Sequence, residues 1–494
     1  MTRILALDQG TTGSTALVID GRGRIVSRAY AEFTQHYPRP GWVEHDAAEI
    51  RDVTFRVAAQ ALQAVGGGVP DAVGITNQRE TVLLWDRASG EPVGRAIVWQ
   101  DRRTADLCRE LKREGREEWV RARTGLVLDP YFSATKLAWM LERDPELRRR
   151  AEAGELAAGT IDSWLVWTLT GGAVHATDPT NAARTLLYDI HTGAWSDELL
   201  DLFGVPRATL PEVRPSAGAF GVVSTAAPGA GAPIAGIAGD QQAALFGQGC
   251  WEPGRAKSTY GTGAFLLMHT GAEPVESDNG LLTTVACDAR GGPAYALEGS
   301  IFIAGAAIQW LRDELGVIDA AAETEALARS LEDNAGVYLV PAFAGLGAPH
   351  WHADARGMVV GLTRGSGRAH LARAALEAMA YGTREVLEAM EADAGRRAPS
   401  LAVDGGASAN GWFVEFLAGT LDIPVLRPPQ IETTALGAAG LAGIGAGVWT
   451  DGDAFLEARG EFERFEATQE PATRAANWRG WRRAVAAAVA WANA

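Results

Sequence analysis

Near its start the chain reads Arg3-Ile-Leu-Ala-Leu-Asp-Gln-Gly-Thr-Thr-Gly13, a short apolar run that ends in a Gly/Thr turn. A second apolar run, Ala16–Asp20, and an extended segment, Ile25–Phe33, follow, with another glycine turn between them. Short apolar runs separated by glycine turns are typical of an antiparallel β-meander. We therefore expect the fold to begin with three antiparallel strands.

Helices and strands alternate after the meander. Asp46 begins a capping-box-like segment, and apolar residues recur at helical spacing over Ile50–Val65 until a run of three glycines ends the pattern. Ala72–Thr76 and Thr81–Asp86 have the composition of strands. This mixture predicts an α/β architecture for the N-terminal part.

The second half of the chain shows the same alternation. A Gly/Ala/Pro-rich stretch, Thr225–Pro233, marks a break in composition. The last 45 residues, rich in Ala, Arg and Trp, are expected to be helical. Further predicted elements are strands at Pro233–Gly239 and Leu401–Val403, a turn and strand over Thr259–His269, and helices at Gln241–Gly247, His370–Glu391 and Ala409–Gly419.

One short internal repeat connects the two halves. Tyr260-Gly-Thr-Gly263 resembles the turn at Gly10–Gly13, since both are Gly/Thr turns between apolar runs. One such turn in each half suggests a duplicated fold with a cleft between the copies, although four residues are little on which to base a repeat.

The composition limits the class of protein. A length of 494 residues suggests two domains, and 47% hydrophobic with 21% charged residues is typical of a globular chain. The net charge of −16 disfavours nucleic acid and anionic membranes as partners, because both would repel the average surface. Three widely spaced cysteines favour neither disulfides nor zinc. Asp8 interrupts the first apolar run too early for a signal peptide, so we expect a cytoplasmic protein without integral membrane association.

The first Gly/Thr turn is a candidate phosphate site. Glycines let the backbone approach a phosphate, and threonine hydroxyls and main-chain N–H groups supply donors. Asp8, at the end of the first predicted strand, could hold Mg²⁺ directly or through water. The chain has no Walker P-loop, so no P-loop lysine would help to bind a nucleotide. A polar hairpin turn is the structural alternative.

Three other segments have equally simple structural alternatives. Asp240, between a predicted strand and helix, is either a general base or a helix N-cap. Gly405-Gly406 either lets a nucleoside lie on the backbone or forms a plain strand-to-helix turn. Arg79-Glu80, with Trp99 downstream, either binds a small polyol or forms a surface ion pair. Neither metal-binding histidine spacing nor a serine-hydrolase motif is present.

Taken in order along the chain, these segments resemble the FGGY carbohydrate kinases over residues 3–446. Many ordered matches are far more specific than any one motif, and they reverse the preference for the structural alternatives. The segments that carry the resemblance are Ala6–Thr12, Pro40–Asp46, Gly74–Thr81, Ile97–Thr104, Tyr131–Trp139, Thr177–Thr185, Gly236–Gly247, Thr259–Gly263, Pro341–Pro349, Gly361–Gly365 and Val403–Asn410.

The resemblance implies an α/β fold of two actin-like (ribonuclease-H-like) domains, each with a mixed sheet flanked by helices, closing on an interdomain cleft. We assign residues 1–247 to an N-terminal domain that binds polyol and phosphate, and residues 248–494 to a C-terminal domain that binds nucleotide. The implied reaction is ATP-dependent phosphorylation of glycerol to sn-glycerol 3-phosphate, with Mg²⁺ as cofactor and a role in glycerol catabolism and glycerolipid supply. We also expect a homo-oligomer, a dimer or a tetramer.

Matching positions give each candidate residue a role. Asp240 would be the general base, and Asp8 would lie near Mg²⁺. Trp99 and Phe265 match the apolar walls of the glycerol site. Hydrogen bonds to glycerol are expected from Arg79, Glu80, Tyr131, Asp240 and Gln241. ATP is expected to contact the turns at Thr11, Thr12, Gly13 and Thr262, and, on the adenosine side, Gly305, Gln309, Gly406 and Asn410.

Two departures from the family pattern affect nucleotide binding and regulation. Thr15 stands where family members commonly carry an arginine, so the sequence leaves open which group supplies that positive charge. The loop Ala226–Ala232 lacks the arginine that some members use to bind fructose 1,6-bisphosphate and the histidine that others present for phosphorylation. We therefore predict that both kinds of regulation are absent.

Two rival functions follow from the same residues. A kinase for another polyol or a ketose would keep the fold, but a longer sugar would need the room that Trp99 and Phe265 fill. A non-catalytic nucleotide-binding regulator would not need Asp240, so retention of this carboxylate favours an enzyme.

Overall fold

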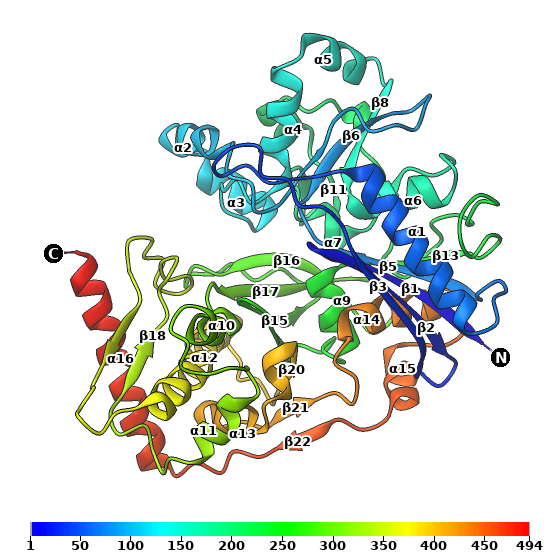
Figure 1. The fold of residues 1–494 in the computed structure, drawn as a ribbon. Helices are drawn as coiled ribbons and strands as arrows, with labels where there is room; N and C mark the ends of the chain where they lie inside the picture. The colour runs from blue at the N-terminus through cyan, green and yellow to red at the C-terminus, as the bar shows by residue number, and fades with distance from the viewer. Residues whose placement is uncertain (1, 494) are drawn as a thin grey trace.

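The first of two large mixed β-sheets begins with the predicted meander (Figure 1). The computed structural model describes residues 2–493. Three antiparallel strands are followed by two strands parallel to the first, in the order β13-β5-β1-β2-β3. The strands are β1 (Arg3–Gln9), β2 (Gly13–Asp20), β3 (Ile25–Glu32), β5 (Ala72–Asn77) and β13 (Ile234–Gly239). The expected meander is confirmed.

The second large sheet repeats this topology. Its order is β16-β17-β15-β14-β20-β21-β22, in which β17-β15-β14-β20-β21 corresponds to β3-β2-β1-β5-β13 of the first sheet. The Gly10 amide donates to the Gly13 carbonyl at 2.9 Å, and the Gly261 amide donates to the Gly263 carbonyl at 2.8 Å. The strands are β14 (Ala256–Tyr260), β15 (Ala264–Gly271), β16 (Leu282–Cys287), β17 (Pro293–Ile301), β20 (Leu401–Asp404), β21 (Val425–Arg427) and β22 (Glu463–Phe465). The repeat between the halves is thus real, and the two-part α/β fold is confirmed.

A smaller sheet and its helices form the upper part of the molecule in Figure 1. They are inserted between β5 and β13, apart from the short strand β4. The sheet, in the order β4-β7-β6-β8, consists of β4 (Glu44–His45), β6 (Val82–Asp86), β7 (Ala96–Ile97) and β8 (Leu156–Thr160). The inserted helices are α2 (Ala105–Arg113), α3 (Glu117–Thr124), α4 (Ser133–Glu142), α5 (Pro145–Glu152), α6 (Ile161–Leu169), α7 (Pro179–Ala182) and α8 (Asp197–Phe203).

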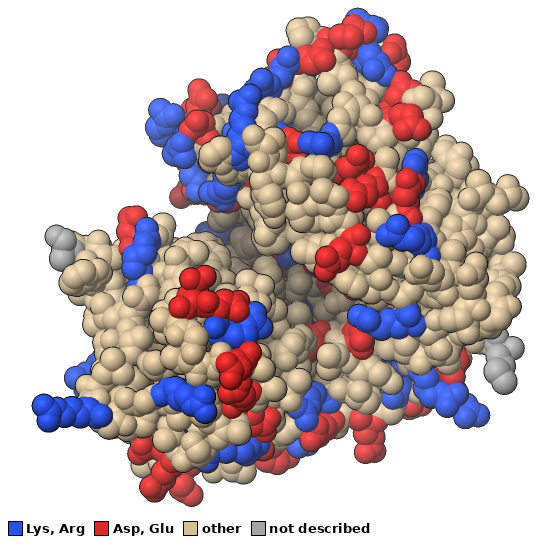
Figure 2. Space-filling model, in the orientation of Figure 1, with Lys and Arg blue, Asp and Glu red and all other residues tan. Residues whose placement is uncertain are grey.

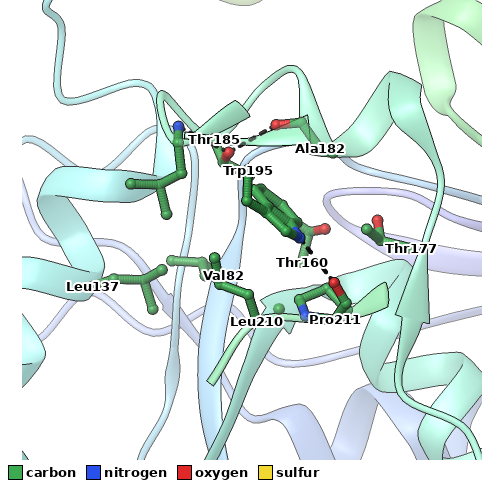
Figure 3. A pocket seen from close by; sticks show the side chains of 11 residues that line it. Val82, Leu137, Thr160, Thr177, Ala182, Thr185, Trp195, Leu210 and Pro211 are labelled. Atoms are coloured by element: carbon green, nitrogen blue, oxygen red, sulfur yellow. Dashed lines mark hydrogen bonds between the residues drawn. The ribbon is translucent and has the colours of Figure 1, made fainter. Parts of the chain in front are cut away.

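The small pocket in Figure 3 lies within this inserted part. Trp195 and Leu137 are among its lining side chains, and the Trp195 indole N–H donates to the Pro211 carbonyl at 2.9 Å. Its volume is about 10 Å³, which is no more than one water molecule needs. The cavity is therefore a packing defect and not a ligand site.

Helices cover both large sheets. Helix α1 (Ala47–Ala64) starts at the predicted cap, since the Asp46 carboxylate accepts from the Ala48 and Glu49 amides. In the second half, α12 (Arg368–Ala394) packs beside α13 (Gly411–Leu421) over a core of aliphatic side chains. The other helices there are α10 (Gly305–Asp313), α11 (Glu323–Arg329), α15 (Gly452–Arg459) and α16 (Pro471–Ala492).

One helix from the C-terminal part of the chain packs on the first sheet. Helix α14 (Thr433–Gly445) lies against β1, β5 and β13 and against α9 (Asp240–Gly247). Glycines make this contact close: a Cβ at Gly74 would lie 2.3 Å from the Ala438 carbonyl oxygen, and one at Gly437 would lie 1.8 Å from the Ala243 carbonyl oxygen. Backbones meet here, so α14 ties the second half of the chain to the strands that end at the cleft.

The composition break at Thr225–Pro233 is a loop that leads into β13, a strand of the first sheet. One expectation for the C-terminal residues needs correction. The last 45 residues are helical at α15 and α16, but β22 lies between these helices and pairs with β21 at an edge of the second sheet. Composition alone could not show this strand, because it is held by pairing with β21 and by the packing of Phe465 on the core of the second half. The assignment of residues 1–247 and 248–494 to separate domains stays a prediction.

Within residues 2–493, none of the helices combines the length and the apolar character that crossing a membrane requires.

We predict that Gly437→Ala destabilises the protein by at least about 2 kcal/mol, because the added methyl overlaps the backbone of α9. Alanine normally stabilises a helix relative to glycine, so the sign of the change in the free energy of unfolding tests the close contact. Urea unfolding measures it. Gly94→Ala is the control, since its Cβ would meet nothing within 4 Å. Equal stability of the two variants would contradict the contact.

Candidate functional site

A hollow opens between the upper and lower parts of the molecule on the face shown in Figure 2, where positive and negative side chains are interspersed. The parallel strands β1, β5 and β13 run in one direction, so their carboxyl ends meet at one edge of the first sheet. Asp8 lies near the end of β1, Arg79 and Glu80 follow β5, and Asp240 follows β13. Ligands of open α/β sheets bind at this edge.

Arg79 and Glu80 are buried, with 2% and 1% of their side chains exposed. They do not form the surface ion pair that was the alternative interpretation. The Arg79 Nε lies 3.2 Å from the Asp240 carboxylate and 3.8 Å from that of Glu80. Gly239 makes room for this side chain, because a Cβ there would lie 2.8 Å from the Arg79 Cδ.

Glu80 adopts a left-handed backbone conformation, with φ at +62°. A non-glycine residue rarely accepts this conformation, and the strain is typical of functional sites. The Glu80 carboxylate accepts from the Arg184 Nε at 2.6 Å. The strained turn thus holds a buried carboxylate directly after the arginine.

Asp240 is the first residue of α9 and does not cap the helix, since Gly239 occupies the N-cap position. The Asp240 carboxylate accepts a hydrogen bond from the backbone N–H of Gln241 at 2.7 Å. The Asp240 side chain is 31% exposed. Burial raises the pKa of Asp240, while Arg79 and Lys257 act in the opposite direction. A partly exposed carboxylate beside an arginine suits a proton acceptor.

Asp8 is a second carboxylate at this edge. Burial, together with the Asp240 carboxylate, raises the pKa of Asp8 to about 7. A divalent cation would relieve this cost, so Asp8 fits a magnesium site on chemical grounds. No group of three His, Cys, Asp or Glu side chains among the described residues could hold a metal ion alone. Magnesium is typically held by one or two carboxylates, by substrate phosphates and by water.

Two aromatic rings border the polar cluster. Trp99 and Tyr131 meet edge to face with ring centroids 5.5 Å apart, and the Arg184 guanidinium lies 5.7 Å from the centre of the Tyr131 ring. The Trp99 indole N–H donates to the Thr11 hydroxyl at 3.0 Å. The expected apolar wall is therefore bonded directly to the first Gly/Thr turn.

The buried Lys257 positions the side chain of Gln241, one of the residues expected to bind the polyol. The Lys257 Nζ donates to the Gln241 side-chain oxygen, to the Thr259 hydroxyl at 2.9 Å and to the Phe265 carbonyl at 3.3 Å. Because an ammonium group only donates, the Gln241 amide must present its oxygen to Lys257 and keep its NH₂ for another partner. Phe265, on β15, is only partly buried.

A separate pocket of about 500 Å³ lies in the second half of the molecule. This volume is in the usual range for small-molecule sites. Apolar side chains such as Ile308 and Met379 line it together with polar groups. All five residues expected on the nucleotide side in this half contribute to the lining: Thr262, Gly305, Gln309, Gly406 and Asn410.

The remaining expected nucleotide contacts lie in the turn before β2. Thr12 is exposed and Thr11 partly buried, whereas Gly13 is buried on β2. A Cβ at Gly13 would lie 2.7 Å from the Tyr30 ring and from the Ala31 carbonyl oxygen. Gly13 therefore has a packing role as well as its expected place in the phosphate turn. None of the three is among the residues that line the 500 Å³ pocket.

Three buried charged residues were not selected from the sequence: Arg184, Lys257 and Glu298. Glu298 on β17 accepts from Arg79 and Arg184, and Lys257 donates to Gln241. Lys257 could have been noticed, since it is one of only three lysines in a chain with 45 lysines and arginines. Glu298 left no sequence signal, because its partners lie more than one hundred residues away.

The fold and the site define a class of protein. The sequence profile of the N-terminal domain of the FGGY family of carbohydrate kinases matches residues 3–247, and that of the C-terminal domain matches residues 256–446. The chain belongs to this family. The resemblance noted from the motifs is confirmed.

Among its relatives, the chain is similar to glycerol kinases over its whole length. It is 57% identical to the glycerol kinase of Alkalilimnicola ehrlichii, with 100% of this chain and 99% of that one covered. It is 56% identical to the glycerol kinase of Halorhodospira halophila, with 99% and 97% covered. The crystal structure of Plasmodium falciparum glycerol kinase with ADP superimposes with a TM-score of 0.93 at 34% identity, with 99% and 98% covered.

We predict that Asp8→Asn stabilises the protein without ligand or metal, and more so at about pH 8 than at about pH 5. The folded-state pKa of about 7 lies above the ordinary value of 3.8. The contribution of Asp8 to the free energy of unfolding is therefore most favourable below about pH 4, where the carboxyl group is protonated. This contribution is lost as the pH rises to about 7 and the buried group ionises. Thermal unfolding in a chelating buffer at both pH values measures the change.

Asp20→Asn is the matched control for this experiment. Hydrogen bonds from Arg24 and Arg22 outweigh the effect of burial and lower the pKa of Asp20. Its favourable contribution is present at both pH values, so its loss lowers the Tm by a similar amount at each. An Asp8→Asn variant that behaved like this control would contradict the raised pKa of Asp8.

Proposed function

We propose that this chain catalyses the ATP-dependent phosphorylation of glycerol to sn-glycerol 3-phosphate. The observation that carries the proposal is the polar cluster at the ends of β5 and β13, where the buried Arg79 lies 3.2 Å from the partly exposed Asp240 and beside Glu80. Similarity to glycerol kinases over the whole chain supports the assignment.

The polar groups around Asp240 suit a small triol. Arg79 and the free NH₂ of Gln241 supply donors, whereas Glu80 and Asp240 supply acceptors. Trp99 and Phe265 would contact the carbon chain. Such a site discriminates strongly, because an analogue that lacks a hydroxyl leaves buried groups without a partner. The site should therefore bind glycerol in preference to simple alcohols, which have fewer hydroxyl groups.

The nucleotide would extend from the 500 Å³ pocket toward Asp8. Adenosine would occupy the pocket beside Gly406 and Gln309, while the two Gly/Thr turns would donate backbone N–H groups to phosphate oxygens. The corresponding structure from Plasmodium falciparum is described with ADP. Asp8 would hold the magnesium ion of the nucleotide, directly or through water. When bound, Mg²⁺ neutralises charge that develops on the phosphate oxygens.

Asp240 would act on the attacking hydroxyl of glycerol. As the oxygen–phosphorus bond forms and the bond to ADP breaks, the Asp240 carboxylate takes the hydroxyl proton. A loose transition state demands little basicity, so correct placement contributes more than a high pKa. Placement by Arg79 and exclusion of water between the two halves would provide most of the acceleration and suppress ATP hydrolysis. The homo-oligomeric state stays a prediction.

We predict that Asp240→Asn lowers kcat about 100-fold to 10,000-fold, because the variant cannot accept the proton. ADP binding, measured by calorimetry, should stay within about threefold of the wild type. The turnover assay couples ADP release to NADH oxidation and is run with glycerol, erythritol and xylulose.

Asp451→Asn provides the control, since Asp451 only caps α15 and asparagine caps equally well. Unchanged turnover in Asp240→Asn would remove this residue from the mechanism. Higher kcat/KM of the wild type for xylulose than for glycerol would refute the proposed substrate.

We predict that Gly406→Val raises the KM for ATP about tenfold or more and leaves the KM for glycerol unchanged. A Cβ at Gly406 meets no atom within 4 Å, so the variant folds and its side chain occupies the pocket. Gly305→Val is the contrasting variant, because its Cβ would lie 2.5 Å from the Gly261 carbonyl oxygen and should lower the Tm. Normal ATP affinity in Gly406→Val would place adenosine elsewhere.

A further inference from the structure

Glu298 connects the two halves of the molecule at the site. It lies on β17 of the second sheet, and 3% of its side chain is exposed. Its two oxygens accept from the Arg79 Nη1 at 2.6 Å and from the Arg79 Nη2 at 3.1 Å. One of these oxygens also accepts from the Arg184 Nη2 at 2.9 Å. Both arginines belong to the first half of the chain.

The two-point contact fixes the plane of the Arg79 guanidinium. A planar group with parallel bonds to one carboxylate cannot rotate without breaking both. Nη1 donates in addition to the Gln242 side-chain oxygen at 3.2 Å. In this orientation the remaining Nε lies 3.2 Å from the Asp240 carboxylate. Glu298 thus fixes the orientation of the Arg79 guanidinium beside the expected proton acceptor.

Glu298 also balances the charge of the two buried arginines, Arg79 and Arg184. Arg79 and Arg184 are two buried cations, and Glu80 and Glu298 are two buried anions that share Arg184. Burial opposes ionisation of Glu298, but Arg184 and Arg79 outweigh it and lower its pKa to about 2. Without Glu298, the Arg79 charge would be left to Glu80 and Asp240.

We propose that Glu298 is a positioning residue for phosphoryl transfer: it holds Arg79 so that one nitrogen contacts Asp240, and it keeps the carboxylate of Asp240 free for the substrate hydroxyl. This inference rests on the proposed function. Without Glu298, the guanidinium turns and pairs with both oxygens of Asp240, which then compete with the hydroxyl for the same contacts. Because the bond joins β17 to the turn after β5, it also forms only when the two halves have this relative placement.

The test is Glu298→Gln, which keeps the size of the side chain and removes its charge. We expect kcat/KM for glycerol to fall about 100-fold through both a lower kcat and a higher KM, because Arg79 leaves its place. The KM for ATP and the affinity for ADP should stay within about threefold, since the 500 Å³ pocket does not include Glu298. Glu298→Asp retains the charge and should recover at least about one tenth of the kcat/KM for glycerol that Glu298→Gln loses.

Glu377→Gln is the matched control. Glu377 on α12 is also buried, with 2% of its side chain exposed, and accepts from the Arg373 Nε at 2.8 Å, but neither residue belongs to the site. A purely structural ion pair should lower the Tm and leave kcat and both KM values of the folded enzyme unchanged. Thermal unfolding of each variant separates this effect from loss of placement.

The outcomes distinguish the inference from the proposed function. A wild-type enzyme with no activity on glycerol refutes the proposed function and with it the inference. An active wild type, with a Glu298→Gln variant that keeps its kcat and its KM for glycerol, overturns the inference alone. A variant that behaves like Glu377→Gln also overturns it. Loss of kcat/KM for glycerol with partial recovery in Glu298→Asp supports it.

Discussion

The pairing of Arg79 with carboxylates from both halves of the chain is the interaction on which the site depends. Arg79 follows a strand of the first sheet, Asp240 follows another, and Glu298 lies on the second sheet. Burying a guanidinium is unfavourable unless each of its donors is bonded. Carboxylates from three parts of the chain therefore have to meet around it, and this requirement holds the two sheets in one relative placement.

The cost of this arrangement appears in the backbone and in the titrating groups. Glu80 has a left-handed conformation, and burial raises the pKa of Asp8 to about 7. Neither feature stabilises the folded chain, and both are typical of sites shaped for binding and chemistry. The stability comes from elsewhere, in particular from the close contact of α14 with the strands and helix that lead to the cleft. Rigid packing behind the site thus supports strained groups within it.

Local patterns predicted a large part of this structure. The meander, the Asp46 cap of α1 and the two Gly/Thr turns follow from neighbouring residues, because turn and cap geometry depends on contacts within a few positions. Composition missed β22, since a three-residue strand depends on pairing with its neighbour. The bonds from Arg79 to Glu298 join residues 219 positions apart, a separation at which no local pattern carries information.

The sequence by itself determined the family, the α/β class of the fold and the types of side chain available at the site, because ordered motifs and short-range periodicity record these directly. Only the tertiary structure decided against the structural alternatives for Arg79–Glu80 and Asp240. Arg79 and Glu80 are buried and not a surface pair, and Asp240 follows an N-cap and does not serve as one. The physical reason is that burial and hydrogen-bond partners are properties of the assembled sheets, which bring distant residues within 3 Å of each other.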